Sequence, residues 1–194
     1  MQSFLARADQ AELKVCLKIN ALSRSGVIRQ GFRIVSRLGD GVLWYSSMVV
    51  FALLGGVDGT KAMLHVGLTS LVGVYLYSYL KNRLVRPRPY VSHGQIVCAI
   101  APLDQYSFPS GHTLHAVLFT TMFAAYEPTT LWLFLPFTLL VALSRIVLGL
   151  HYPSDVLVGG ILGVLLAALS LAGVGTMPVE LAADWTSVLE LWSP

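Results

Sequence analysis

The chain has 194 residues, of which 55% are hydrophobic and only 12% are charged, and its formal net charge is +3. This length fits one domain, and so few charges argue against a water-soluble globular protein. The apolar residues form long blocks that almost lack charge, as a hydrocarbon layer roughly 30 Å thick requires of a helix. We therefore expect an all-α, polytopic transmembrane helix bundle.

The N-terminal region is basic and amphipathic, since seven of the thirteen Lys and Arg residues precede residue 40. Residues 11–38 have helical periodicity with a break at Ser25-Gly26, and charges interrupt their apolar positions. This pattern is typical of a helix that lies on anionic headgroups, so we expect a bilayer and no nucleic acid as partner. The expected organisation is one domain over residues 1–194, with an interfacial segment (1–40), a transmembrane core (41–175) and a C-terminal tail (176–194).

Five later segments are long and apolar enough to span a bilayer. They are residues 41–57, 62–80, 113–126, 130–148 and 156–174. Short turns connect some of them, but residues 81–108 form one long polar loop, and loops of that length are usually functional or disordered. In the last segment Gly159 and Gly163 form a GxxxG pair, which predicts a close contact with another helix.

The long loop opens with four cations within eight residues, from Lys81 to Arg88, and closes with the sequence Pro109-Ser110-Gly111-His112. Taken alone, the cations are equally typical of a cluster that sets topology or binds headgroups. The glycine allows close approach of the backbone to a ligand, and a helix start directs free N–H groups at an anion.

A third polar group follows the fourth segment, with Ser144-Arg145, then His151, then Asp155 at the start of the fifth segment. Each residue has a simpler explanation, because an arginine near the bilayer edge can snorkel and an aspartate favours a helix N-terminus. The order of the helices, however, brings the ends that carry all these groups to one membrane face. That face would hold three cations, backbone amides, two histidines and a carboxylate.

This mixture suits phosphoryl transfer, which requires neutralised phosphate oxygens and in-line positioning of the attacking and leaving groups. Arginine binds phosphate oxygens bidentately and lysine supplies a point charge. A single metal ion held by His112, His115, His151 and Asp155 is the alternative, but the neighbouring cations would repel it. We expect neither a metal nor an organic cofactor, and we interpret His115 as a packing residue.

The ordered pattern KxxxxxxRP (Lys81 to Pro89), PSGH (Pro109 to His112) and SRxxxxxHxxxD (Ser144 to Asp155) resembles the signature of the type 2 phosphatidic acid phosphatase superfamily, the lipid phosphate phosphatases. All eleven identities occur at the expected spacings, and three motifs in order are far more specific than one. The resemblance is close over residues 81–155 and general in the flanking helices. Members of this family commonly have six spanning helices, so six spans remain an alternative to five.

The resemblance implies a catalytic role for three residues. His151 would be the nucleophile that forms a phosphohistidine, Asp155 would accept a hydrogen bond from its other ring nitrogen, and His112 would be the general acid and then the base. The phosphate of a lipid substrate would be bound by Lys81, Arg88, Ser110, Gly111 and Arg145. Arg83 and Arg86 fall outside the matched identities and are interpreted as possible headgroup contacts.

Several other classes of protein are compatible with the sequence. Vanadium haloperoxidases share such a pocket but are soluble and larger, whereas a lipid phosphotransferase or a non-enzymatic protein that binds acidic lipids would suit a membrane. Candidate substrates are phosphatidic acid, phosphatidylglycerol phosphate, polyprenyl phosphates or diphosphates, and phosphorylated glycolipids. In a bacterial-type inner membrane, charge bias places the catalytic face in the cytoplasm, but family habit places it outside.

Overall fold

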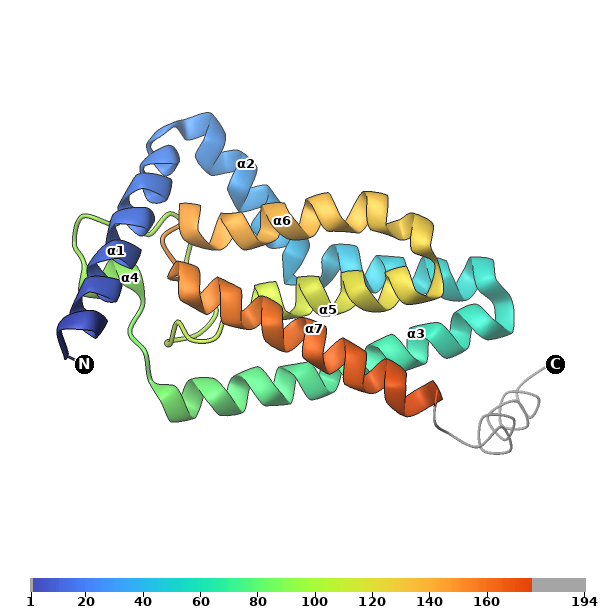
Figure 1. The fold of residues 1–194 in the computed structure, drawn as a ribbon. Helices are drawn as coiled ribbons and strands as arrows, with labels where there is room; N and C mark the ends of the chain where they lie inside the picture. Colours follow the sequence, from blue (N-terminus) through green and yellow to red (C-terminus); the bar gives the residue numbers. More distant parts are fainter. Residues whose placement is uncertain (1, 176–194) are drawn as a thin grey trace.

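The computed structural model describes residues 2–175 of the chain, with side chains from residue 10 to residue 173. All regular structure in this part is helical, so the all-α prediction is confirmed (Figure 1). The helices are α1 (Gln2–Asn20), α2 (Gly26–Arg37), α3 (Leu43–Leu84), α4 (Pro89–Ser92), α5 (Gly111–Tyr126), α6 (Leu131–Val147) and α7 (Pro153–Gly175). The expected tail, residues 176–194, lies outside the described residues.

The N-terminal region forms two helices, α1 and α2, that meet at an angle beside one end of the bundle (Figure 1). A 3-10 turn, Ala21–Arg24, joins them, and α2 begins at Gly26, which confirms the predicted break. The Arg33 side chain on α2 donates from Nε to the Ala99 carbonyl oxygen at 2.6 Å, which ties α2 to the long loop. The interfacial position of this region stays a prediction.

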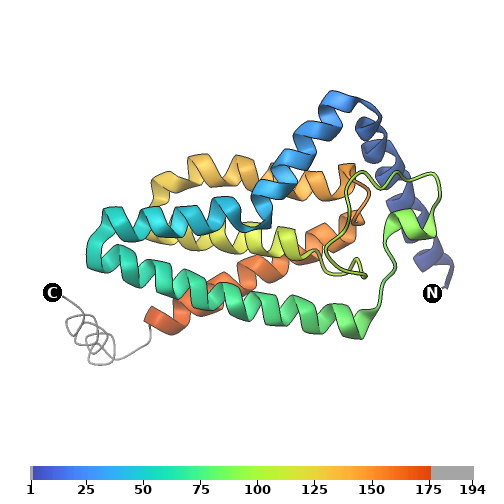
Figure 2. The same ribbon diagram turned by 180° about the vertical axis from the view of Figure 1, so that it is seen from behind.

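Helix α3 is a hairpin of two antiparallel limbs, because the chain folds back at Gly56 (Figures 1 and 2). Gly56 has φ 58° and ψ −132°, a conformation that side-chain-bearing residues rarely adopt. The two limbs correspond to the predicted segments 41–57 and 62–80. The first limb begins only at Leu43, after a π turn from Leu38 to Val42, and the second runs one turn further than predicted, to Leu84.

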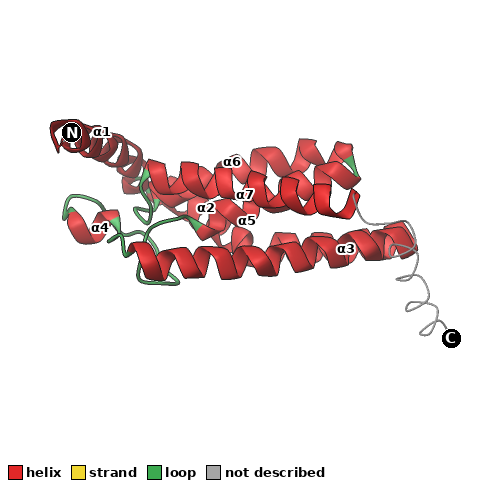
Figure 3. Ribbon diagram, turned by 60° about the horizontal axis from the view of Figure 1, so that its bottom comes forward, coloured by secondary structure: helices red, strands yellow, loops and turns green. Residues whose placement is uncertain are grey.

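Helix α5 lies at the centre of the bundle, packed against α3, α6 and α7 (Figure 3). Its 16 residues give a length of about 24 Å, less than the roughly 30 Å of a hydrocarbon core. Leu114, Leu118 and Met122 are completely buried, so the neighbouring helices, and not lipid, cover this helix. A central helix of this kind tolerates a length that a lipid-facing helix would not.

Three stretches of the described chain are long and apolar enough to cross a membrane: Gly26–Ser92, which contains both limbs of α3, Pro128–Val147 and Pro153–Gly173. The outward-facing side chains agree with a lipid environment, since Leu139, Leu157 and Leu169 are 62%, 65% and 71% exposed. The chain is therefore a transmembrane helix bundle, and the count of five spans stays a prediction.

Helices α5 and α7 approach each other closely at the predicted glycine pair. A Cβ atom on Gly159 would lie 2.6 Å from the Ser110 carbonyl oxygen, and one on Gly163 would lie 2.5 Å from the Leu114 carbonyl oxygen. Only a residue without a side chain permits such a contact, so the predicted close helix contact is confirmed. The contact places the start of α5 directly against the start of α7.

We expect Gly159→Ala to lower the thermal unfolding midpoint in detergent and to reduce activity, because the added methyl group would overlap a backbone oxygen, at a cost of about 1–3 kcal/mol. Gly160→Ala is the matched control, since its Cβ atom would find its nearest neighbour, Val117 Cγ2, at 3.8 Å. An unchanged unfolding midpoint in Gly159→Ala would show that α5 and α7 can move apart without a loss of stability.

Candidate active site

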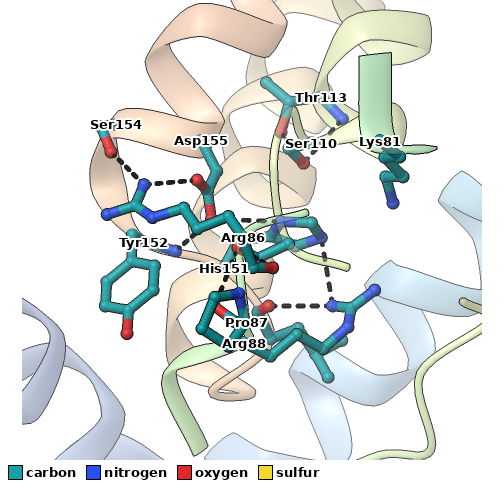
Figure 4. A network of polar contacts seen from close by, with 12 residues as sticks. Lys81, Arg86, Pro87, Arg88, Ser110, Thr113, His151, Tyr152, Ser154 and Asp155 are labelled. Atoms are coloured by element: carbon teal, nitrogen blue, oxygen red, sulfur yellow. Dashed lines mark hydrogen bonds and ion pairs between the residues drawn. The ribbon is translucent and has the colours of Figure 1, made fainter. Parts of the chain in front are cut away.

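The three motifs meet at the end of the bundle where α3 ends and α5 and α7 begin (Figure 4). Six of the eight predicted site residues line one pocket of about 420 Å³, namely Lys81, Arg88, Gly111, His112, Arg145 and His151. The two others, Ser110 and Asp155, are completely buried behind the pocket wall. The helix ends thus bring together residues that are up to 74 positions apart in the sequence.

Ser110 is the N-cap residue of α5. Its hydroxyl lies 2.9 Å from Thr113 Oγ1 and accepts from the Thr113 backbone N–H at 3.4 Å, while its own backbone N–H donates to the Asp155 carbonyl oxygen at 3.1 Å. The side chain expected to contact phosphate therefore stabilises the helix start. Gly111, the next residue, is the one that lines the pocket.

Three buried cations surround the pocket, with Lys81, Arg88 and Arg145 only 5%, 2% and 3% exposed. Arg88 Nη1 donates to the Leu150 carbonyl oxygen at 2.9 Å, and Arg145 donates from Nη1 to the Ser36 hydroxyl on α2. Burying three positive charges together is unfavourable unless anionic groups compensate them. The three buried cations therefore require anionic groups close to them.

His151 lies at the centre of this charge cluster, in the loop before α7, and is 2% exposed. Its Nε2 atom is 3.5 Å from Arg88 Nη1, and burial, together with the charges of Arg145, Arg88 and Lys81, holds the pKa of the imidazole well below its ordinary value. The ring is consequently neutral near pH 7. A neutral imidazole has one ring nitrogen with a free lone pair, which a nucleophile requires.

Asp155 lies next to His151, but the expected hydrogen bond between the two side chains is absent. His151 Nδ1 and Asp155 Oδ2 are 3.6 Å apart, and Oδ2 accepts instead from the Tyr152 backbone N–H at 2.8 Å. His151 Nδ1 has no hydrogen-bond partner among the described residues. The pair is therefore oriented but not hydrogen-bonded in this structure.

Arg86, which the sequence pattern left outside the site, holds the Asp155 carboxylate in place (Figure 4). Its Nη1 atom donates to Asp155 Oδ1 at 2.6 Å and to the Ser154 hydroxyl at 2.7 Å, and its guanidinium lies 4.0 Å from the centre of the Tyr152 ring. This arrangement compensates the charge of a carboxylate that is 0% exposed. Arg86 thus supports Asp155, one of the predicted catalytic residues.

Helix α1 reaches the same group through Glu12. Glu12 Oε2 accepts from Arg86 Nη2 at 2.8 Å, and Oε1 accepts from the Ser154 backbone N–H at the start of α7 at 2.7 Å. A carboxylate at a helix N-terminus is favourable because it pairs with free N–H groups. The N-terminal region is therefore joined to the predicted catalytic residues by a chain of contacts from Glu12 to Arg86 to Asp155.

His112, the predicted acid and base, also has a carboxylate partner. Its Nε2 atom contacts Oδ1 of Asp40, which lies in the π turn between α2 and α3. Asp40 is flanked by Gly39 and Gly41, and Gly41 has a φ of 135°. A Gly-Asp-Gly sequence is typical of an unusual turn, but it does not indicate that the carboxylate contacts His112.

His115 was interpreted as a packing residue, but it lines the pocket beside His112. Its Nδ1 atom is 2.9 Å from the Gly111 carbonyl oxygen and its Nε2 atom is 3.1 Å from the Ser70 carbonyl oxygen, so both ring nitrogens face the backbone. In the part of the chain that the structure describes, no group of three or more His, Cys, Asp and Glu side chains is arranged to hold a metal ion.

The PAP2 superfamily matches residues 62–177 of the chain. The decaprenylphosphoryl-5-phosphoribose phosphatase of Mycobacterium tuberculosis strain H37Rv is 31% identical over 170 residues, covering 84% of this chain and 90% of that protein. The undecaprenyl-diphosphatase BcrC of Bacillus subtilis strain 168 is 32% identical over 105 residues, which are 54% of each chain.

Among solved structures, Aquifex aeolicus LpxE superimposes with a TM-score of 0.72 at 25% identity, over 82% of this chain and 94% of that one. A PAP2-type phosphatidylglycerolphosphate phosphatase from Bacillus subtilis has the same fold, with a TM-score of 0.67 at 23% identity, over 88% of both chains. The fold, the site and these relatives together define a membrane-embedded phosphatase of lipid phosphates. The chain belongs to the PAP2 superfamily.

Arg86→Met should lower the free energy of unfolding by about 3 kcal/mol, because it leaves the Asp155 carboxylate buried without its cation. The double variant Arg86→Met/Asp155→Asn should recover part of this loss, since the uncompensated charge is gone. Arg83→Met is the matched control: Arg83 is exposed and lies 5.5 Å from the Tyr79 ring, so we expect a change within about 0.5 kcal/mol. Unfolding in detergent measures the free energy of unfolding of all three variants. An equal decrease in Arg86→Met and in the double variant would contradict an energetic coupling between Arg86 and Asp155.

Proposed function

We propose that this protein removes a terminal phosphate from an isoprenoid lipid, either a polyprenyl diphosphate or a polyprenyl-linked sugar phosphate, through a phosphohistidine on His151. The observation that carries the proposal is the His151 Nε2 atom, which lies 3.5 Å from Arg88 Nη1 inside a pocket that Lys81 and Arg145 also line. A phosphate bound by these cations would present its phosphorus atom to the imidazole.

The size and lining of the pocket support a substrate with a polar headgroup. A volume of about 420 Å³ lies within the range of sites that enclose small organic ligands, so there is room beyond the phosphate itself. Asn82, Gln105 and Tyr106 supply hydrogen-bonding groups to the lining, and Tyr45 and Val74 supply apolar surface. The relatives named for undecaprenyl diphosphate and decaprenylphosphoryl-5-phosphoribose favour the isoprenoid class.

In the first chemical step, the lone pair on His151 Nε2 attacks phosphorus while the bond from phosphorus to the leaving oxygen breaks. His112 donates a proton to that oxygen, and Lys81, Arg88, Arg145 and the Gly111 amide stabilise the charge on the remaining phosphate oxygens. Asp155, held by Arg86, stabilises the positive charge that develops on the His151 ring.

In the second step, water attacks phosphorus and the bond between phosphorus and His151 Nε2 breaks. His112 takes a proton from the water, and inorganic phosphate leaves. Asp40 orients the His112 ring for both transfers. A transferase would replace water with an acceptor alcohol, so release of free phosphate separates the two reactions.

We expect His151→Ala to release no phosphate above background from any lipid, because the variant has no nucleophile. The assay uses detergent-solubilised protein with excess chelator and a panel of polyprenyl diphosphate, polyprenyl-linked sugar phosphate, phosphatidylglycerol phosphate and phosphatidic acid. The wild type should retain its activity in chelator and prefer the first two substrates.

The control for this experiment is His93→Ala, because His93 lies at the end of α4 and is absent from the pocket lining. Near-normal turnover of His151→Ala would exclude the covalent mechanism. A preference for phosphatidic acid would leave the mechanism intact and exclude the isoprenoid substrate.

We further propose that the protein resides in a bacterial-type inner membrane. Its catalytic end, the end of the bundle with the pocket that Lys81, His112 and His151 line, would face the cytoplasm. Seven Lys and Arg residues belong to the N-terminal region beside this end, whereas Lys61 follows the hairpin turn at the opposite end. The positive-inside rule favours the cytoplasm for the more basic end.

Cys98 provides the test of orientation, because it is exposed on the long loop of the catalytic end. Cys16 will not interfere: it is buried, and burial together with nearby carboxylates raises the pKa of its thiol to about 12. We expect an impermeant maleimide to modify Cys98 only after the cells are permeabilised, with Cys98→Ser as the control. Labelling of intact cells would place the catalytic end outside.

A further inference from the structure

The carboxylate of Asp104 binds the two cations that would hold the substrate phosphate. Asp104 Oδ2 is 2.6 Å from Lys81 Nζ, and Asp104 Oδ1 is 2.7 Å from Arg88 Nη2. Asp104 lies on the long loop, outside all three motifs, and lines the pocket. A carboxylate that bridges an ammonium and a guanidinium group uses the same donors that a phosphate would use.

Two features keep this carboxylate close to the cations but free to move. The Asp104 carbonyl oxygen accepts from Arg88 Nε at 3.1 Å, and the Ser107 backbone N–H donates to the Arg86 carbonyl oxygen at 2.9 Å, so the backbone is anchored. The Asp104 side chain is 38% exposed, whereas Arg88 is 2% exposed. The carboxylate can therefore rotate away while it remains a tethered competitor at high effective concentration.

The Asp104 carboxylate also stays charged when a substrate approaches. Burial acts to raise the pKa of this carboxyl, but the hydrogen bonds and charges of Lys81 and Arg88 outweigh burial and hold the pKa below its ordinary value. A phosphate oxygen cannot share a proton with such a group near pH 7. Two anions at this position would repel each other, so one of them has to leave.

We propose that Asp104 is an internal competitor for the phosphate position, which a substrate displaces only if its phosphate carries more than one negative charge. This inference rests on the proposed role of Lys81 and Arg88 in binding phosphate. A phosphate monoester or diphosphate has nearly two or more charges at pH 7 and gains more from the cations than the carboxylate does. A phosphodiester carries only one negative charge, as the Asp104 carboxylate does, and it lacks the high effective concentration of a group attached to the chain. It therefore does not displace Asp104.

Discrimination against phosphodiesters is important for a site in a bilayer. Phosphodiesters are the headgroup linkages of bulk phospholipids and surround the pocket in large excess over any lipid monoester. A bare site with three buried cations would bind them, and the substrate would have to compete. With Asp104 in place, the abundant diesters have no net gain on entry, and the site stays available for the rarer substrate.

The first measurement is the affinity of inorganic phosphate for detergent-solubilised protein at pH 7.5, by calorimetry, in the wild type and in Asp104→Asn. We expect the variant to bind phosphate at least about tenfold more tightly, because the competitor has lost its charge. Asp104→Glu, which keeps the charge, should return the affinity toward that of the wild type. Asp58→Asn is the matched control, since Asp58 is 94% exposed near the hairpin turn, away from the pocket.

The second measurement is turnover of the lipid substrate in micelles with increasing phosphatidylglycerol. Wild-type turnover should change only as dilution in the micelle requires, whereas Asp104→Asn should show additional competitive inhibition with a raised apparent KM. Asp104→Ala repeats both measurements, so a folding defect specific to one variant does not decide the result.

The outcomes separate this inference from the proposed function. The inference is overturned if the wild type binds phosphate and both Asp104→Asn and Asp104→Ala bind it equally or more weakly. That result would leave the proposed role of Lys81 and Arg88 in binding phosphate unaffected. Absence of phosphate binding in the wild type and in both variants overturns the proposed role of Lys81 and Arg88 itself. If the Asp104 variants bind phosphate more tightly but phosphatidylglycerol does not inhibit them, Asp104 competes with phosphate but does not exclude phosphodiesters.

Discussion

The close approach of α5 and α7 is the constraint on which the catalytic end depends. At Gly159 and Gly163 the backbone of α7 lies against the carbonyl oxygens of Ser110 and Leu114, and the Ser110 N–H donates to the Asp155 carbonyl oxygen. These contacts fix the start of α5 relative to the start of α7, and so fix the two predicted catalytic histidines, one on each side of the junction. Since interhelical contact in a bilayer depends on packing more than on the hydrophobic effect, small residues at this contact decide the geometry.

Charge compensation is the second organising principle, because three cations are almost completely buried at this end. The motifs supply only one carboxylate, Asp155, and it pairs with Arg86 and not with the three. The compensation comes from elsewhere: Asp104 contacts two of the cations, and Asp40 lies near Arg145 and contacts His112. In a site of low dielectric these partners determine how much positive charge a substrate meets.

The sequence was sufficient for the parts of the molecule that depend on short-range patterns. Long apolar segments predicted the helices, the GxxxG pair predicted the α5–α7 contact, and three spaced motifs predicted the residues that gather at one end. The sequence could not identify the partners of those residues. Arg86, Glu12, Asp40 and Asp104 act through ion pairs with residues far away in the chain, and such pairs depend on how loops and rotamers meet after folding. Ser110 is the converse case, since its local role as an N-cap takes its side chain away from the pocket.

The chain of contacts from Glu12 to Arg86 and α7 also constrains how the enzyme is made. Glu12 bonds to the backbone of Ser154, which follows it by 142 positions, and Arg86 lies between them in the sequence. During synthesis, Glu12 and then Arg86 leave the ribosome well before Ser154 and Asp155 exist. The Asp155 carboxylate, which has a catalytic role in the proposed mechanism, thus receives its counter-ion only when α7 inserts beside the preceding helices. A chain in which α7 has not inserted lacks the contacts of Glu12 and Arg86 with Ser154 and Asp155, so under the proposed mechanism the site is complete only in the fully inserted bundle.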